Sequence, residues 1–265
     1  MNPFSDVDRS GRALELVDYL DHAHRGLHAP KILMRAGLDL AQGSHVLDLG
    51  CGTGHELIEL ERAGWHAYGI DSSAAMLDHC RARLKSDGLP ARLTLGDAHR
   101  LPFPDRTFDG CRIERVLQHL ADPATALKEV RRVLRPGGRL AVMEPDWASF
   151  TLASADTEAV RAVADSVGGH IPHREIGRHL RRLLVDAGFE DLHSEVDLAV
   201  YRTTAELSHV ISLERAAERA WTTGRIERSR AETLLLEQRD LSESGGFHAT
   251  LNRVVVAWAR SPAQE

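Results

Sequence analysis

Several residue types are scarce in this 265-residue chain, and each scarcity excludes a class of protein. The three cysteines, Cys51, Cys80 and Cys111, are an odd set without metal-ligand spacing. We therefore expect reduced, buried thiols in a cytosolic protein. No apolar run reaches the roughly 18 residues that a membrane helix requires. The opening residues, MNPFSDVDRSGR, lack the apolar core of a signal peptide.

Positive charge is also limited. The formal net charge is −6 and no basic tract occurs. Phosphate binding needs clustered Lys and Arg, so nucleic acid is not an expected partner, and neither is a membrane. With 43% hydrophobic and 27% charged residues the composition is that of an ordinary globular protein. The length fits a single α/β domain over 1–265.

Short apolar runs alternate with helical segments in the first half of the chain. After N-terminal helices within 11–42, strands are expected at the following positions: 45–50, 66–70, 92–95, 108–113 and 139–144. Strands that alternate with helices at this spacing indicate βαβ units. The predicted fold is α/β, with a doubly wound, mostly parallel sheet of seven strands.

The second half is richer in helix. Two further strands are expected at 192–200 and 247–259, and two helical insertions at about 147–174 and 203–243. Asp122 and Asp156 are predicted helix caps, and Thr203 with Glu206 has the spacing of a capping box. Five apolar residues of the second insertion fall on one helical face: Leu207, Val210, Ile211, Ala217 and Trp221. That face either packs on the sheet or forms a lid or a dimer face, so the chain is expected to be a monomer or a homodimer.

A glycine-rich loop follows the first predicted strand. In VLDLGCGTG, from Val46 to Gly54, the glycines are Gly50, Gly52 and Gly54. Glycine lets a ligand approach the backbone closely, and the helix that follows offers unpaired N–H groups. The spacing is GxGxG and not the GxGxxG of dinucleotide binders.

Acidic residues end the next two predicted strands. Asp71 closes the second strand, where a carboxylate can accept both hydroxyls of a ribose. Asp97 closes the third strand in GDAHRLPF, where it can accept a hydrogen bond from an adenine amino group and leave the Ala98 N–H for the ring. The carboxyl ends of neighbouring parallel strands converge on one crevice. These positions therefore predict a nucleoside-binding site.

These motifs carry a resemblance to a known family. VLDLGCGTG, GIDSSAAML, GDAHRLPFPDRTFD and RVLRPGGRL resemble the class I methyltransferases. Within that family the chain resembles small-molecule methyltransferases of the ubiquinone/menaquinone-biosynthesis type. RVLQHLADP, MEPDW and YLDHA resemble one bacterial branch of the group, and the similarity spans about Arg12 to Arg260.

The resemblance implies S-adenosyl-L-methionine as cofactor. It implies roles for these residues: Gly50, Gly52 and Gly54 beside the methionine portion, Asp71 on the ribose, Ser72 and Met76 flanking the adenosine, Asp97 and Ala98 on the adenine, Glu114 and Arg115 by the methionine amino group, and Tyr19 covering the cofactor. It also places Gln118 and His119 next to the transferable methyl group.

Candidates for the acceptor side follow the fourth and fifth strands. His119 is a candidate general base that would need little tuning at neutral pH, or else it packs beneath the next helix. Glu144 and Asp146 are expected at the rim of the crevice, where Asp146 is a second catalytic candidate, unless both cap a loop. Gln118 and Trp147 are the other expected substrate contacts, with Trp147 as an apolar wall.

A group of histidines lies near the end of the first insertion. His170 and His173, with Glu175 and His179 close by, fit no standard metal-ligand motif, and no metal is expected. His173 is a candidate substrate contact, and a solvated loop is the alternative.

The combined interpretation is a methyltransferase that acts on an O or N atom of a small, aromatic or polyketide-like metabolite. Methyl transfer depends mainly on alignment in a dry pocket, so no fixed catalytic triad is expected. The alternatives are C-methylation of a quinone-like acceptor and a cofactor-binding protein without transferase activity. An NAD-dependent dehydrogenase is disfavoured by GxGxG and by the lack of a second nucleotide-binding half.

Overall fold

A computed structural model describes residues 7–9, 15–18, 20–21 and 27–263, without the side chains of 253–257. These residues form one eight-stranded sheet. Its strands are β1 (His45–Leu49), β2 (His66–Asp71), β3 (Leu93–Leu95), β4 (Phe108–Glu114), β5 (Leu134–Glu144), β6 (Thr151–Leu152), β7 (Glu190–Tyr201) and β8 (Ala249–Arg260).

The sheet is parallel in its first part and antiparallel at its far side. Strands β3, β2, β1, β4 and β5 lie side by side in that order and are parallel. Strand β8 runs antiparallel to β5, to β7 on its other side, and to the short β6. Since β2 and β3 lie on one side of β1 and β4 and β5 on the other, the sheet has a switch point between β1 and β4.

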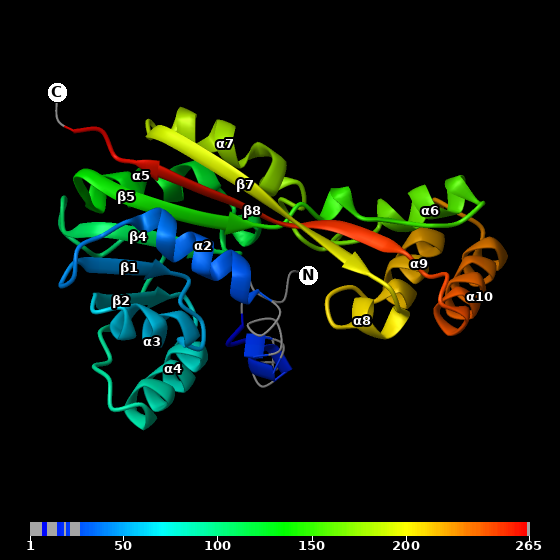
Figure 1. The fold of residues 1–265 in the computed structure, drawn as a ribbon, viewed down its shortest axis with the longest axis horizontal. Helices are drawn as coiled ribbons and strands as arrows, with labels where there is room; N and C mark the ends of the chain where they lie inside the picture. The colour runs from blue at the N-terminus through cyan, green and yellow to red at the C-terminus, as the bar shows by residue number, and fades with distance from the viewer. Residues whose placement is uncertain (1–6, 10–14, 19, 22–26, 264–265) are drawn as a thin grey trace.

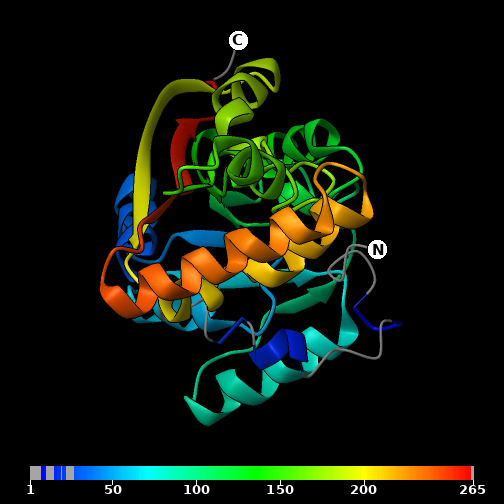
Figure 2. The same cartoon turned by 90° about the vertical axis from the view of Figure 1, so that its right-hand side faces the viewer.

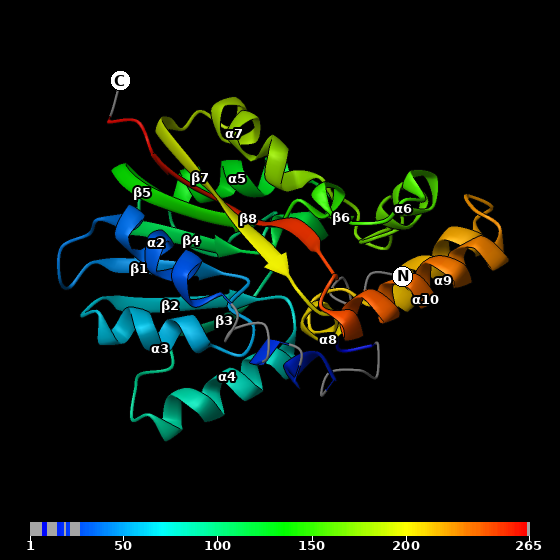
Figure 3. The ribbon, with the colours of Figure 1, turned by 45° about the vertical axis from the view of Figure 1, so that its right-hand side comes forward.

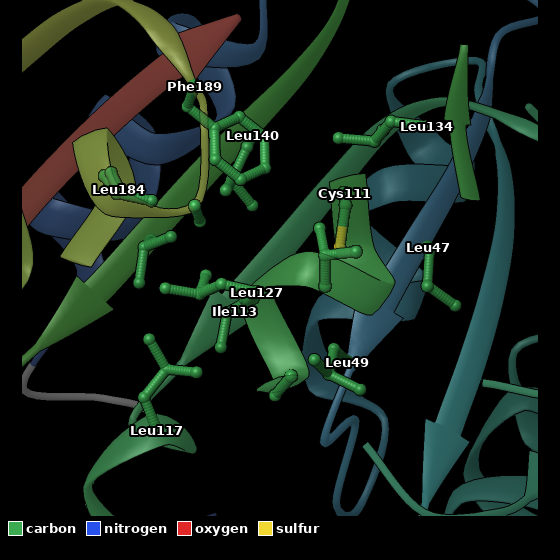
Figure 4. Packing of buried hydrophobic residues seen from close by; sticks show 14 of the residues in the cluster. Leu47, Leu49, Cys111, Ile113, Leu117, Leu127, Leu134, Leu140, Leu184 and Phe189 are labelled. Atoms are coloured by element: carbon green, nitrogen blue, oxygen red, sulfur yellow. The ribbon is translucent and has the colours of Figure 1, made fainter. Parts of the chain in front are cut away.

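Helices cover both faces of the sheet (Figure 1, Figure 3). They are α2 (His28–Leu38), α3 (His55–Arg62), α4 (Ala74–Ser86), α5 (Pro123–Val133) and α7 (Ile176–Asp186). Side chains of α2, α3 and α4 share one buried cluster with β1 and β2. Those of α5 and α7 share another with β1, β4 and β5, in which Leu127 lies near Ile113 and Phe189 near Leu140 (Figure 4). The prediction of a doubly wound α/β fold is confirmed.

The two predicted insertions contain four further helices of the described residues. These are α6 (Thr157–Ala164), α8 (Thr204–Ser208), α9 (Leu213–Thr222) and α10 (Arg228–Ser244). Together with the ends of β7 and β8 they bury a hydrophobic cluster of their own. Figure 2, which looks onto this end of the molecule, shows α9 and α10 beside each other. Within the described parts of the chain, no helix combines the length and apolar character needed to cross a bilayer.

The predicted caps are present, with one difference. The side chains of Asp122 and Asp156 accept hydrogen bonds from the backbone three residues ahead, at 3.1 and 3.0 Å. Thr203 likewise accepts from the N–H of Glu206 at 3.1 Å. The Glu206 carboxylate, however, accepts from the N–H of Arg202 at 2.7 Å and not from that of Thr203, so the reciprocal half of the capping box is absent.

Two strand predictions need correction. The sheet has eight strands among the described residues and not seven, because the two-residue β6 pairs with β8 inside the first insertion. Strand β5 begins at Leu134, five residues before its predicted start. Helix α5 ends at Val133 and Leu134 is already extended, since Pro136 disfavours helical backbone just before it.

Candidate active site

A cavity of about 1200 Å³ opens at the carboxyl ends of the parallel strands. The ends of β1, β2 and β4 line it on one side, and helix α9 with the segment 166–172 lines it on the other. Pockets for a single small ligand measure roughly 300–1,000 Å³, so this cavity is larger than a single small ligand usually needs.

The glycine loop contributes backbone to the cavity wall. Gly50 and Gly52 line the cavity, and both have positive φ, at 71° and 49°. Gly54 also has a positive φ, of 82°, but it does not line the cavity. A Cβ at Gly54 would collide with the Cys80 sulfur on α4, so glycine is needed there for helix packing. The prediction that Gly54 contacts the cofactor is therefore not supported by its position.

Asp71 connects the glycine loop to strand β2. Its carboxylate accepts hydrogen bonds from the backbone N–H groups of Gly52 and Ser73, each at 2.9 Å. Burial raises the pKa of this carboxyl, while these backbone donors act in the opposite direction. Asp71 lines the cavity together with Ser72 and Met76, so these three predicted cofactor residues lie where a ligand could contact them.

Asp97 and Ala98 line the cavity beyond the end of β3. The Asp97 carboxylate accepts from the backbone N–H of His99 at 2.9 Å and lies 2.7 Å from the His99 ring nitrogen Nδ1. The backbone hydrogen bond, together with the histidine ring, lowers the pKa of Asp97. The side chain is 68% exposed, so it is ionised and accessible at the cavity mouth.

A buried charge network lies beneath the β4 end of the cavity. Arg112 is 2.8 Å from Asp48 and 2.5 Å from Glu114, and Lys31 is 3.1 Å from Glu114 and 3.3 Å from Glu56. Burial alone would raise the pKa of Glu114, but the neighbouring cations outweigh it and lower the pKa to about 2. Glu114 lines the cavity and therefore presents a fixed negative charge to it.

Four members of this network were not predicted as site residues: Lys31, Asp48, Glu56 and Arg112. A signal was present in the sequence for two of them. Asp48 and Arg112 are charged residues inside apolar strands, and the register of the sheet places them opposite each other. Aligning the first and fourth strands by their apolar residues would have indicated a buried ion pair.

His119 and its neighbours line the middle of the cavity. Burial lowers the pKa of His119 to about 3, and the charges of Arg115 and His170 act in the same direction. The imidazole is thus neutral at neutral pH but a weak proton acceptor. The expectation that His119 needs little tuning to act as a base is wrong. Arg115 has a φ of 54°, which turns the chain sharply at the end of β4.

Gln118 and Trp147 lie together in the cavity wall. The Trp147 indole N–H donates to the Gln118 side-chain oxygen at 2.7 Å, and the Gln118 amide donates to the backbone oxygen of Arg115 at 3.2 Å. Both side chains are nearly buried, so the indole is held in one orientation. The predicted positions of these two residues agree with the structure, and their role in acceptor binding stays a prediction.

Glu144 and Asp146 do not reach the cavity, and the prediction that they lie at its rim is wrong. Glu144 is fully buried and accepts from the N–H groups of Val116 and Leu117, at 2.8 and 2.7 Å, where it caps the short helix η1 (Leu117–His119). Burial raises its pKa to about 8. Asp146 is nearly buried and accepts one hydrogen bond at each carboxylate oxygen from Arg178, at 2.8 and 3.0 Å.

The histidine group of the first insertion is arranged differently from the prediction. His173 does not line the cavity, and its backbone N–H donates to the backbone oxygen of Gln118 at 3.2 Å. His170 lines the cavity in its place. In the described portion of the chain no three His, Cys, Asp or Glu residues are grouped to hold a metal ion. Tyr19, the predicted cover of the cofactor, lies outside the described residues.

Comparisons with known proteins identify the family of the chain. Residues 47–142 match a family model described as a methyltransferase domain. The chain is 40% identical over 267 residues to a protein named "Uncharacterized 37.1 kDa protein in transposon TN4556" from Streptomyces fradiae, which covers 96% of this chain and 75% of that protein. It is 30% identical over 227 residues to the ubiquinone/menaquinone biosynthesis C-methyltransferase of Neisseria meningitidis serogroup A, over 71% of this chain and 89% of the relative.

A solved structure supports the fold. The YcgJ protein of Bacillus subtilis superposes with a TM-score of 0.63 at 18% identity, over 89% of this chain and 100% of that chain. A parallel sheet with a cavity at its switch point, lined by a glycine loop and strand-end acids, defines an α/β enzyme that binds a nucleoside cofactor. With its relatives, the chain belongs to the class I S-adenosylmethionine-dependent methyltransferases and resembles those of ubiquinone and menaquinone biosynthesis.

Proposed function

We propose that this enzyme transfers a methyl group to an O or N atom of a small-molecule metabolite. The observation that supports this most is the cavity of about 1200 Å³, which exceeds the space one ligand needs and continues from the strand ends to the two insertions. A protein that bound the cofactor without transferring its methyl group would need no second compartment.

The cofactor half of the proposal rests on charge and backbone. Glu114, Asp71 and Asp97 line the cavity from the ends of three strands. Such acids suit a ligand that carries a sulfonium, an amino group and ribose hydroxyls. Gly50 and Gly52 allow its close approach to the backbone of the loop. Beside these residues, the proposal keeps Ser72, Met76, Ala98 and Arg115 as contacts.

The acceptor half of the proposal rests on the side chains that are available to orient the acceptor and to exclude water. Bound S-adenosylmethionine would supply the methyl group: a lone pair of the acceptor forms the new bond to carbon while the C–S bond breaks and its electrons stay on sulfur. Trp147 and Gln118 would orient the acceptor, and the apolar side chains of the two insertions would exclude water. An O–H or N–H acceptor also loses its proton, to water or to a basic side chain.

The pKa of His119 bears on which acceptors the site can use. With a pKa near 3, this imidazole is a weak base. The proposal therefore takes an acceptor whose ionised oxygen or neutral nitrogen already has a lone pair available, because such a group asks little of a base.

The insertions at about 147–174 and 203–243 are proposed to act as a lid over the acceptor compartment. Support comes from helix α9, whose side chains line the cavity although its opposite side packs in the insertion cluster. The proposal includes a cytosolic location, which the free, buried thiols of Cys51, Cys80 and Cys111 fit.

Product analysis tests the proposal. Purified enzyme is incubated with ¹³C-methyl-labelled S-adenosylmethionine and a panel of phenols, amines, carboxylates and quinols, and S-adenosylhomocysteine formation is followed. NMR of the products then distinguishes O-, N- and C-methyl groups. A product labelled only at carbon would overturn the O or N assignment, and cofactor binding with no turnover across the panel would favour the non-transferase alternative.

A further inference from the structure

Helix α9 turns a cationic face toward the acceptor side of the cavity. Ser212, Arg215, Ala216 and Arg219 are spaced i, i+3, i+4 and i+7, and all four line the cavity. Leu213, Ala217 and Ala220 are buried in the hydrophobic cluster of the insertions together with Ala216, and this packing fixes which face of the helix meets the cavity. Two arginines one helical turn apart thus point to the same space.

Neither arginine has a carboxylate partner among the described residues. Many exposed arginines of the chain form ion pairs, whereas neither Arg215 nor Arg219 forms one with any residue that the structure describes. Arg219 is held against the first insertion, since a Cβ at Gly169 would lie 3.0 Å from its Cδ. The two insertions therefore meet beside the Arg219 side chain.

The basic groups around this compartment form a continuous series. Burial lowers the pKa of His170, and the charges of Arg219 and Arg215 lower it further. The charges of Arg115 and His170 in turn help to lower the pKa of His119, which burial lowers most. The acids that line the cavity come from other elements: Glu15 from the N-terminal segment, and Asp71, Asp97 and Glu114 from the strand ends.

We infer that the methyl acceptor is an apolar small molecule with a carboxylate group, and that Arg215 and Arg219 bind this carboxylate. Guanidinium groups hold carboxylates through paired, charge-assisted hydrogen bonds. The body of the acceptor would lie against Trp147 and Ile171. This inference rests on the proposed function and adds the acceptor class to it.

Charge-matched ligands test the inference. Enzyme saturated with S-adenosylhomocysteine is titrated by calorimetry with benzoate, 2-hydroxybenzoate and 1-hydroxy-2-naphthoate, and with the primary amide of each acid. Acid and amide have nearly the same shape and differ in charge. We expect at least one acid to bind about tenfold or more tightly than its amide. We expect Arg215→Gln combined with Arg219→Gln to abolish that preference.

A matched control removes two other arginines. Arg202 and Arg239 are exposed and do not line the cavity, so Arg202→Gln combined with Arg239→Gln should retain the preference for the acid. If the first double variant does not fold, the single variants replace it. In the wild-type enzyme the preference should also weaken as NaCl is added.

The remaining outcomes would overturn either the inference or the proposed function. Equal binding of all acids and amides, or a preference that survives in the Arg215 and Arg219 variants, overturns the inference. Loss of S-adenosylhomocysteine binding in those variants also overturns it, because the arginines would then serve the cofactor carboxylate. If wild-type enzyme binds no S-adenosylhomocysteine at all, the proposed function itself fails.

Discussion

The carboxylate of Asp71 accepts a hydrogen bond from the backbone N–H of Gly52 at 2.9 Å, so the end of strand β2 holds the glycine loop in place. A second hydrogen bond, from Ser73 at 2.9 Å, orients the same carboxylate at the start of α4. The group that is proposed to bind the ribose is thus also the group that shapes the loop beside it, and the two functions share one side chain.

Replacement of Asp71 should weaken cofactor binding strongly. Asp71→Ala removes the proposed ribose contact and frees the loop, and we expect the Kd for S-adenosylhomocysteine to rise about 10- to 100-fold, the range for hydrogen bonds to a charged group. Asp71→Asn should give a smaller loss because it retains an acceptor oxygen. Calorimetry measures both. Asp78→Ala, an exposed acid on α4, is the control. Unchanged affinity in Asp71→Ala would contradict the assignment.

A comparison of Gly54 with Gly88 distinguishes two reasons why a position requires glycine: left-handed backbone and lack of space for a Cβ. Both have positive φ, at 82° and 68°, but a Cβ at Gly54 would strike the Cys80 sulfur, whereas a Cβ at Gly88 would meet nothing within 4 Å. Gly88→Ala should cost about 1–2 kcal/mol, the cost of left-handed backbone for a residue with a Cβ. Gly54→Ala should cost more than that, measured by urea denaturation. Equal losses would mean that the contact with Cys80 is relieved without cost.

The sequence was sufficient to predict the fold and most of the strand-end residues that line the cavity. Gly50, Asp71 and Asp97 could be placed from the local sequence alone, because each follows a short apolar run that predicts a buried strand. The position of Glu144 was predicted wrongly because the sequence does not show the sharp turn at Arg115. This turn brings the N–H groups of Val116 and Leu117 within hydrogen-bonding distance of the Glu144 carboxylate.

The acceptor side could not be derived in the same way. Arg215 and Arg219 lie about 100 residues beyond the β4 end of the cavity, on a helix that reaches the cavity only because the second insertion folds against the first. Helical periodicity indicated which face of that insertion is apolar, but not what the opposite face meets. The pKa of His119 likewise depends on burial and on Arg115 and His170, which are brought together only in the folded chain.

The ion pair between Arg112 and Asp48 should be important for stability. Both side chains are almost completely buried and lie 2.8 Å apart. Arg112→Met leaves Asp48 buried without its partner, which should cost about 3–5 kcal/mol of unfolding free energy. Arg81→Met, which breaks an exposed pair with Asp78, should cost about 0–1 kcal/mol. Chemical denaturation of both variants gives the comparison, and similar losses in the two would contradict a structural role for the buried pair.

Glu144 should make the enzyme less stable as pH rises. Burial raises its pKa in the folded chain to about 8, above the ordinary value of 4.5. Below pH 4.5 the carboxyl is protonated in both folded and unfolded chains, so its contribution to stability is fully present. Between pH 4.5 and 8 the unfolded chain releases this proton while the folded chain keeps it, and stability falls by up to about 1.4 kcal/mol per pH unit.

Glu144→Gln tests this pH dependence because glutamine can still accept from Val116 and Leu117 but does not ionise. The unfolding free energy of wild type minus that of the variant should decrease steadily from pH 5 to pH 8. Urea denaturation at four pH values measures the difference, and Glu243→Gln, a change at an exposed glutamate, should give a difference that does not vary with pH. A flat difference for Glu144→Gln, or one that grows with pH, would mean that the buried carboxyl is ionised in the folded enzyme and stabilised by the N–H groups of η1.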